Sequence, residues 1–287
     1  GWRIVPSSRS YFPAIDDKDI ECALVRAQEI SRYVENGLFD LALTGLDWIL
    51  ENESDVVEVA DLVYSKATAK PAKWVLAVAD NSDIKTLEDL NGKKIATELV
   101  NFTRRYFEER GINVEVEFSW GATEAKVVDG LVDAIVEVTE TGSTIRAHNL
   151  KIIHELLVTN TKLIANKKSW EDKAKRAKIE QVAMMLKSAL TAADMTGLKM
   201  NAPKAKLQEI IEMLPSITSP TVSPLFDSQW FSVETIIQET QARDLIPSEP
   251  SRFIGEMGKD DIRFSGGKQD AEPDKATGSA RLDALKA

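Results

Sequence analysis

Short apolar segments alternate with turn-bounded, helix-compatible segments across residues 74–138, and this alternation constrains the fold more than any other feature. The run WVLAVA (74–79) is continuously apolar, which suits a strand covered on both faces. A helix-compatible segment with a threonine N-cap and a glycine stop follows, TLEDLNG (86–92), and then the strand-like KKIATEL (93–99). The alternation continues to DAIVEV (133–138). The pattern predicts a mostly parallel α/β sheet.

Outside this region the chain divides into segments of different composition. The stretch GLFDLALTGLDWIL (37–50) predicts a short strand, a glycine turn and the start of a helix. Apolar residues recur at helical spacing in residues 169–195, which predicts a helix that packs through one face. From residue 197 onward, β-like and helical segments follow closely, and we expect a third, smaller α+β domain there. Residues 248–287 have few apolar positions, so they predict a weakly ordered tail.

Charge and cysteine content disfavour several classes of protein. A formal net charge of −10 argues against nucleic-acid or anionic-membrane binding, because both need a basic face. No apolar run approaches the roughly 20 residues that span a bilayer. Cys22 is the only cysteine, which excludes an intrachain disulfide framework and favours a reducing compartment. We therefore expect a cytoplasmic protein that binds neither nucleic acid nor membrane.

The stretch TETGST (139–144) directly follows the strand-like DAIVEV and is rich in hydroxyl groups. In α/β sheets, ligands bind at the carboxyl ends of strands, where a loop that enters a helix presents unpaired N–H groups. Glycine lets the backbone approach a ligand closely, and hydroxyls donate hydrogen bonds. The residues that suit such an anion-binding loop are Thr141, Gly142, Ser143 and Thr144. From spacing alone, an ordinary Thr/Ser-rich turn remains open as an alternative.

Two acidic residues, Asp133 and Glu137, lie four positions apart in the strand before this loop and point to the same side. Their separation would be about 13 Å, too far for a pair of carboxylates that act together. We therefore expect only Glu137 beside the loop. An acidic group next to a phosphate-binding loop suits a sugar phosphate, because the carboxylate accepts hydrogen bonds from ribose hydroxyls.

Several segments together resemble ATP phosphoribosyltransferase, the first enzyme of histidine biosynthesis. They are RAQEISRYVENGLFDLALTGLDWIL (26–50), KKIATELVNFTRRYF (93–107), FSWGATEAK (118–126) and DAIVEVTETGSTIRAHNLKII (133–153). Two later segments, SPTVSPL (219–225) and WFSVETII (230–237), resemble the regulatory domain of the long form of that family. The resemblance extends in order from residue 1 to about residue 247.

The resemblance implies a two-lobed α/β catalytic region, similar in fold to periplasmic binding proteins, and a C-terminal ferredoxin-like α+β regulatory domain. Residues 1–70 with 167–195 would form the first lobe, and residues 71–166 the second, which carries the phosphoribosyl-binding loop. Residues 196–247 would form the regulatory domain. The closing helix and strand of the family are not recognisable after Pro247, so we expect this domain to be incomplete.

In that family the TGST-type loop binds the 5-phosphate of phosphoribosyl pyrophosphate, and the preceding acidic residues face its ribose. Asp133 and Glu137 match those acidic residues, so the resemblance implies that they are catalytic. The residues implied to bind substrate are Thr141, Gly142, Ser143, Thr144, Arg26, Thr44, Gly45 and Glu124. A structural role for Arg26 stays open. Family members also carry a basic substrate loop upstream of the match to Gly1, so we expect the ATP end of the site to be incomplete.

The family reaction joins adenine N1 of ATP to C1 of the ribose and expels pyrophosphate. Adenine N1 has a free lone pair at neutral pH, so no strong general base is needed. Mg²⁺ would neutralise the pyrophosphate and be held by substrate and water rather than by the protein. His148 and His154 are six residues apart without a cysteine cluster, and we expect both to be structural.

The resemblance also implies inhibition by histidine and assembly as a hexamer. The residues that match the inhibitor pocket are Asn201, Ser219, Thr221 and Ile236. An alternative of another class is a two-lobed solute-binding or sensor protein without catalysis, which would use the same lobes. Formation of phosphoribosyl-ATP from the two substrates separates these functions.

Overall fold

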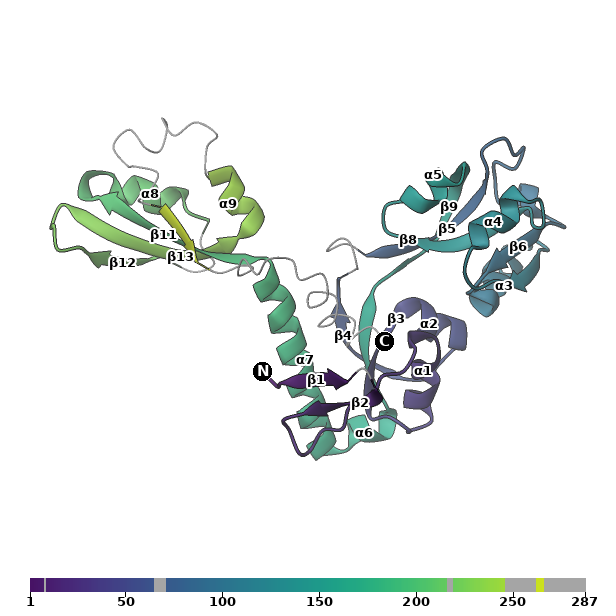
Figure 1. The fold of residues 1–287 in the computed structure, drawn as a ribbon, viewed down its shortest axis with the longest axis horizontal. Helices are drawn as coiled ribbons and strands as arrows, with labels where there is room; N and C mark the ends of the chain where they lie inside the picture. The colour runs from purple at the N-terminus through teal and green to yellow at the C-terminus, as the bar shows by residue number, and fades with distance from the viewer. Residues whose placement is uncertain (8, 65–70, 216–218, 246–261, 266–287) are drawn as a thin grey trace. The chain divides into compact units, whose positions relative to one another are not determined.

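The computed structural model describes residues 1–7, 9–64, 71–215, 219–245 and 262–265. The chain forms two compact units, Gly1–Leu186 and Lys187–Asp274, and each is described by itself. The first unit contains two lobes, each built on its own sheet (Figure 1). No helix in the described ranges has the length and apolar character that crossing a bilayer requires.

The first lobe is built on a three-stranded sheet in the order β3 (Leu41–Gly45), β10 (Thr161–Ala165) and β4 (Val57–Leu62). The central strand β10 runs antiparallel to both neighbours. Helices α1 (Ala27–Glu35) and α2 (Leu46–Asn52) pack on this sheet. Their shared core consists of Ile30, Val34, Ala42, Ile49 and Ile164.

A hairpin and two further helices complete the first lobe. The hairpin comprises β1 (Ile4–Ser7) and β2 (Ser10–Ile15), and the helices are α6 (Lys167–Glu171) and α7 (Lys173–Ala193). The single helix expected over residues 169–195 is thus divided, because Asp172 has an extended backbone conformation between α6 and α7. The Asp17 carboxylate accepts a hydrogen bond from Lys178 Nζ at 2.8 Å, which ties the segment after the hairpin to α7.

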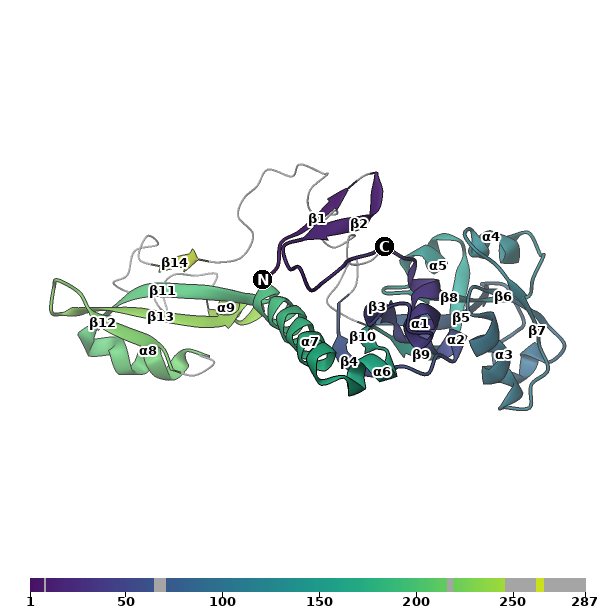
Figure 2. The same cartoon turned by 90° about the horizontal axis from the view of Figure 1, so that it is seen from below.

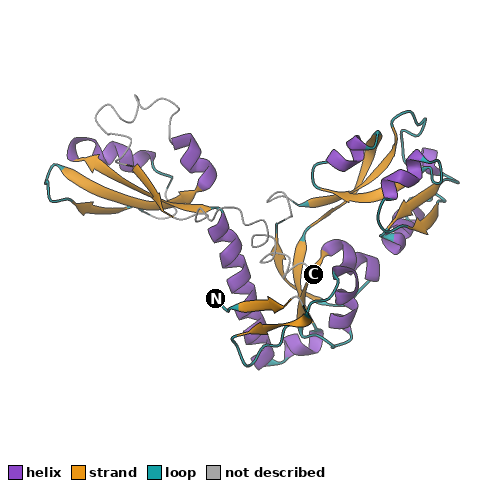
Figure 3. Ribbon diagram, viewed as in Figure 1, coloured by secondary structure: helices purple, strands orange, loops and turns teal. Residues whose placement is uncertain are grey.

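The second lobe is built on a five-stranded sheet in the order β7-β6-β8-β5-β9. The strands are β5 (Ala72–Ala79), β6 (Lys94–Thr97), β7 (Glu115–Phe118), β8 (Ala134–Thr139) and β9 (Leu150–Thr159). Its helices are η1 (Glu88–Leu90), α3 (Val100–Glu108), α4 (Thr123–Val128) and α5 (Ser143–Ala147). Figure 3 distinguishes these strands and helices by colour.

The central strand β5 is covered on both faces, as its apolar run predicts. Trp74 and Leu76 belong to a core that includes Phe107 of α3, whereas Val75 and Ala77 belong to a second core with residues of α4 and α5. Alternate side chains of one strand therefore supply two cores, which leaves no face of β5 for polar residues.

The prediction of a mostly parallel sheet was wrong. Strand β6 runs parallel to β7 and β8, but β5 runs antiparallel to both β8 and β9. The reason is the path of the chain, which enters the second lobe along β5 and leaves it along the adjacent β9 (Figures 1 and 2). Since Thr161 already belongs to the sheet of the first lobe, the return crossing lies at Asn160, before the expected boundary at residue 166.

The second unit is an antiparallel four-stranded sheet with helices. Its elements are β11 (Met195–Pro203), η2 (Lys204–Lys206), α8 (Leu207–Met213), β12 (Thr221–Pro224), β13 (Trp230–Gln238), α9 (Glu239–Leu245) and β14 (Ile262–Ser265). The spatial order β12-β13-β11-β14, with one helix after β11 and one after β13, is the ferredoxin-like arrangement. The expected ferredoxin-like fold is confirmed.

The expectation that this domain lacks its closing helix and strand was wrong. Helix α9 contacts β11 and β13, and β14 pairs antiparallel with β11 from Gly197 to Met200. The strand β14 lies within residues 248–287, which were expected to form a tail. A four-residue segment is too short to show a pattern that predicts a strand. Pairing with β11, and not the local propensity of its residues, stabilises β14. The remaining tail residues, 248–261 and 266–287, lie outside the described ranges.

Candidate functional site

The loop after β8 is shaped by a glycine in the left-handed region. Gly142 has φ +71° and is the N-cap of α5, and its N–H donates to Thr139 Oγ1 at 2.7 Å. A Cβ at this position would lie 2.8 Å from Arg146 Nη1 and 3.2 Å from Ile152 Cδ1. The backbone conformation therefore favours glycine here, and a Cβ would also displace the ends of the Arg146 and Ile152 side chains.

The side chains of Thr141, Ser143 and Thr144 are exposed, so the structure gathers them at the surface next to the buried Gly142. Thr141 Oγ1 donates to Ser143 Oγ at 3.0 Å. Helix α5 has only five residues, so its dipole is short. Anion binding at this loop would therefore depend on hydroxyls and on the N–H groups of the first helical turn, which have no acceptor within the helix.

Glu137 lies near the end of β8, two residues before Thr139, and its side chain is half-buried. Its pKa is raised from 4.5 to about 7, mainly by burial and in addition by the charges of the Glu124 and Glu98 carboxylates. Hydrogen bonds from Val138 N–H and Thr123 act against this shift without cancelling it. A carboxyl group with this pKa changes charge near neutral pH.

Glu137 belongs to a series of carboxylates contributed by separate elements. Glu98 follows β6, and burial raises its pKa while a hydrogen bond from Gln28 of α1 lowers it. Asp47 of α2 raises the pKa of Glu98 through its charge, and burial raises the pKa of Asp47 itself. Glu124, in the first turn of α4, completes the series. Together these groups make a region of negative potential that a cationic or metal-bearing ligand would relieve.

Asp47 is held by partners from both strands that cross between the lobes. Its Oδ2 accepts a hydrogen bond from Trp74 Nε1 of β5 at 2.7 Å. Its backbone N–H donates to Thr159 Oγ1 of β9 at 3.2 Å. The side chain of Asp47 is 6% exposed, so these contacts replace the water that would otherwise solvate it.

Thr44 and Gly45, expected to bind substrate, support this arrangement. The hydroxyl of the buried Thr44 donates to the carbonyl oxygen of Ala27 at 2.9 Å, which fixes the start of α1. A Cβ on Gly45 would lie 1.9 Å from Asp47 Oδ1. Glycine is therefore needed at position 45 so that the Asp47 carboxylate can fold back over the backbone.

Helix α2 also caps a helix of the second lobe. The buried carboxylate of Glu51 accepts hydrogen bonds from Asn101 N–H at 3.0 Å and Phe102 N–H at 2.8 Å, in the first turn of α3. Arg105 of α3 in turn donates to the Leu50 carbonyl oxygen. The unpaired N–H groups of α3 are thus satisfied by the first lobe. Neither Asp47 nor Glu51 was expected to be buried from the sequence, because an acid four residues from another on a helix is usual for an exposed face.

The structure does not bring Asp133 to the loop. Asp133 precedes β8, at the opposite end of the strand from Thr139. Its Oδ2 accepts from Lys94 N–H at 2.9 Å, and Oδ1 lies 3.2 Å from Lys93 Nζ. Burial opposes ionisation, but the hydrogen bond and the lysines outweigh it and lower the pKa of Asp133. In these contacts Asp133 joins the start of β6 to the start of β8.

Arg26 links the two lobes through an aromatic contact. It is the N-cap residue of α1, and its guanidinium carbon lies 5.3 Å from the ring centroid of Trp120, which follows β7. Trp120 is 64% exposed, so a face of this large side chain stays available to solvent. The neighbouring Ala122 has φ +51° and precedes α4, which places Glu124 in the first helical turn.

The residues expected to form an inhibitor pocket lie in the second unit. Leu198, Met200, Val233 and Ile237 form its core. Because neighbouring residues in a strand point to opposite faces, Asn201 and Ile236 lie on the face away from this core. Thr221 pairs with Glu234, which pairs with Lys199 on that outer face. Ser219 is exposed just before β12.

Within the described ranges, no group of three or more histidine, cysteine, aspartate or glutamate side chains could hold a metal ion. His148 Nδ1 lies 2.9 Å from the Thr144 carbonyl oxygen, and His154 Nε2 lies 2.7 Å from the Tyr106 hydroxyl. Both histidines therefore have protein partners.

Residues 26–188 match the family model described as ATP phosphoribosyltransferase, and residues 192–248 match that of the HisG C-terminal domain. ATP phosphoribosyltransferase of Desulfatibacillum aliphaticivorans is 65% identical over 247 residues, covering 86% of this chain and 85% of the relative. That of Solidesulfovibrio magneticus is 64% identical over 247 residues, covering 86% and 84%. The solved ATP phosphoribosyl transferase (HisG:HisZ) complex from Thermotoga maritima superposes with a TM-score of 0.57 at 28% identity, over 66% of this chain and 88% of that chain. The chain belongs to the ATP phosphoribosyltransferase family, in the long form that carries a C-terminal domain.

Proposed function

We propose that this chain transfers the phosphoribosyl group of phosphoribosyl pyrophosphate to N1 of ATP and releases pyrophosphate, the first step of histidine biosynthesis. The matched relatives carry the name of this activity. The observation that supports the site is the adjacency of Glu137, with a pKa of about 7, to the hydroxyl-rich loop at Thr141–Thr144. The alternative of a solute-binding protein receives no support from the matched sequence relatives.

In this proposal the loop holds the 5-phosphate of the sugar. The hydroxyls of Thr141, Ser143 and Thr144 and the first N–H groups of α5 are all donors, which suits a dianionic phosphate. Hydrogen bonds to a charged group are worth about 1.5–3 kcal/mol each. The loop would therefore contribute most of the affinity for the phosphate end of the substrate.

Glu137 would act on the ribose. In the transition state the C1–O bond to pyrophosphate breaks while the bond from N1 to C1 forms, and positive charge develops at C1. A carboxylate already in place stabilises that charge without reorganisation. Because burial and the charges of Glu124 and Glu98 hold its pKa near 7, positive charge at C1 would shift Glu137 toward its ionised form.

The remaining catalytic demand is alignment of two polyanions, because N1 of adenine is nucleophilic without deprotonation. Mg²⁺, when bound to the pyrophosphate, would neutralise its charge as it leaves. We propose that substrate oxygens and water would be the ligands of this metal. Among the described residues, no three or more histidine, cysteine, aspartate or glutamate side chains lie close enough together to hold a metal ion. Arg26 and Glu124 would lie toward the nucleotide, since Arg26 contacts Trp120, which lies in the same β7–α4 connection that leads to Glu124.

Incubation of the purified chain with ATP, phosphoribosyl pyrophosphate and Mg²⁺ tests the function directly. We expect phosphoribosyl-ATP to form, with equal amounts of pyrophosphate. Omission of either substrate is the control. Binding of both substrates without product would contradict the proposal.

We further propose that the second unit binds histidine and that the chain assembles as a hexamer in the cytoplasm. An amide, hydroxyls and an aliphatic side chain on the outer sheet face suit an amino acid, which needs both donors and acceptors. Inhibition requires that histidine bind one global state more tightly than another. Product formation at saturating histidine, together with the mass in solution, tests this proposal.

A further inference from the structure

Arg146, in the last turn of α5, lies against the loop and donates two hydrogen bonds to it. Its Nη2 donates to the Thr141 carbonyl oxygen at 2.8 Å. Its backbone N–H donates to the Gly142 carbonyl oxygen at 3.1 Å. Its Nη1 lies where it would come within 2.8 Å of a Cβ on Gly142. The guanidinium group therefore packs directly on the Gly142 backbone.

The peptide unit between Thr141 and Gly142 is held at both ends. Arg146 binds its carbonyl oxygen, and Thr139 Oγ1 accepts a hydrogen bond from its N–H at 2.7 Å. A peptide unit next to glycine can flip with little steric penalty, because glycine tolerates both signs of φ. The glycine that the positive φ favours at position 142 thus lowers the barrier to rotation, and the two hydrogen bonds hold the peptide in place.

The orientation of this peptide matters for an anionic ligand. In the observed orientation the carbonyl dipole is turned to the guanidinium, and the donors of Ser143 and Thr144 follow directly. In the flipped orientation the carbonyl oxygen would leave Arg146 and turn toward Thr139 Oγ1, where the Gly142 N–H now points. One flip would therefore break both hydrogen bonds and change the backbone conformation that leads into Ser143 and the first N–H groups of α5.

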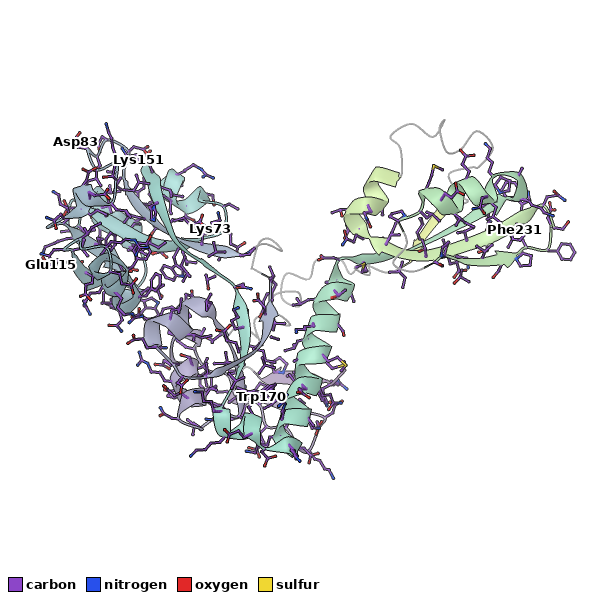
Figure 4. All side chains as sticks on the ribbon, turned by 180° about the vertical axis from the view of Figure 1, so that it is seen from behind. Lys73, Asp83, Glu115, Lys151, Trp170 and Phe231 are labelled. Carbon is purple, nitrogen blue, oxygen red and sulfur yellow. The ribbon has the colours of Figure 1, made fainter. Side chains whose placement is uncertain are left out.

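The side chain of Arg146 also borders a cavity of about 440 Å³ that is lined by Asp80, Arg146, Leu150, Lys151 and Ile152. Lys151 has a different set of contacts, since its Nζ donates to the carbonyl oxygens of Asp80 and Ser82 at 2.9 and 3.0 Å. Figure 4 labels Lys151 near Asp83 in the second lobe, whereas Lys73 lies nearer the strand crossing. Arg146 and Lys151 thus line the same cavity, but they differ in their contacts. Arg146 donates to the loop, whereas Lys151 donates to the carbonyl oxygens of Asp80 and Ser82.

We propose that Arg146 is a positioning residue for the phosphoribosyl-binding loop, which it holds in the orientation that accepts the 5-phosphate. The inference rests on the proposed function, because it takes the loop as the phosphate site. It predicts an effect on affinity for phosphoribosyl pyrophosphate, with little effect on the chemical step once the substrate is bound. Affinity for ATP should not change.

The test uses Arg146→Gln, Arg146→Lys and the matched control Lys151→Met in the full chain. Loss of one charge-assisted hydrogen bond corresponds to about a 10- to 100-fold rise in KM for phosphoribosyl pyrophosphate. We expect this rise in Arg146→Gln, with kcat within about twofold of the parent at saturating substrate. Arg146→Lys keeps the charge and should recover part of the affinity, and Lys151→Met should match the parent.

Calorimetric titration with phosphoribosyl pyrophosphate gives a second readout that does not need turnover. The inference would be overturned if Arg146→Gln bound phosphoribosyl pyrophosphate as tightly as the parent does. It would also be overturned if Lys151→Met lost as much affinity as Arg146→Gln, because that would indicate a general distortion of the cavity. Failure of the proposed function looks different, because the parent itself would then form no product. If Arg146→Gln does not fold, Arg146→Lys decides by the same two measurements.

Discussion

Replacement of Glu137 by glutamine tests two effects of its buried charge: the loss of folding stability that the charge causes, and the contribution of the charge to kcat. The substitution keeps the shape of the side chain and removes its negative charge. In the folded protein the pKa of Glu137 is about 7, compared with 4.5 for the free group. The folded state therefore binds the proton more tightly than the unfolded state, and the parent loses stability as the pH rises from 4.5 through 7.

The size of this loss follows from the shift. One pKa unit corresponds to about 1.4 kcal/mol, so a rise from 4.5 to about 7 corresponds to about 3.5 kcal/mol at most. The glutamine variant lacks this titration. Its free energy of unfolding should therefore exceed that of the parent by an amount that grows with pH and levels off above pH 7. Glu124→Gln, which removes a neighbouring charge, should show the same sign with a smaller amplitude.

Urea unfolding at several pH values between 4.5 and 8.5 measures this difference. In a Trp230→Phe background, tryptophan fluorescence reports on the first unit alone, because the other tryptophans lie in Gly1–Leu186. A stability difference between variant and parent that does not change with pH would refute the raised pKa. The same variant should lose about 10²- to 10³-fold in kcat, the typical effect of removing one preorganised electrostatic group. An unchanged kcat would mean that the carboxylate is structural.

Three other substitutions and one ligand test the remaining assignments. Thr144→Val should weaken phosphoribosyl pyrophosphate binding by about 1.5–3 kcal/mol in calorimetry without unfolding the chain, and unchanged affinity would exclude this hydroxyl. Trp74→Phe removes the donor to the buried Asp47 carboxylate and should destabilise the first unit by about 1–3 kcal/mol in urea, unless Asp47 becomes protonated. Gly45→Ala puts a Cβ 1.9 Å from Asp47 Oδ1, so unfolding should occur at markedly lower urea, whereas a parent-like midpoint would show that Asp47 can turn away. Saturating histidine should reduce phosphoribosyl-ATP formation, and an active enzyme that ignores it would contradict regulation by the second unit.

Local patterns in the sequence were sufficient to predict several elements of the second lobe and the grouping of hydroxyl residues after β8. Continuous apolar residues over WVLAVA predicted a strand with two covered faces, and β5 has them. The glycine and hydroxyl residues of TETGST lie within a few positions of one another, so their grouping needs no long-range contact. The position of Glu137 beside them follows from the period of two residues in a strand.

Features that depend on which strands and helices meet were decided by the tertiary structure. Asp133 contacts Lys93 and Lys94 because β8 pairs with β6 in this register. The carboxylates of Asp47 and Glu51 are buried because α2 of the first lobe packs against β5 and α3 of the second. No local signal in LDWILEN distinguishes such acids from ordinary surface residues.

Strand direction and the closing strand have the same origin. The antiparallel pairing of β5 with β9 joins residues about eighty positions apart, and β14 exists as a strand through its pairing with β11. The periodicity of apolar residues indicates which faces of a segment are buried. It does not indicate which strand will pair with that segment, because pairing is made by backbone N–H and C=O groups, which are the same in every sequence. Hence the sequence by itself determined elements with a strong local pattern, such as β5, and the grouping of hydroxyl residues in the loop, and the tertiary structure determined the strand pairing and the charged groups around Glu137.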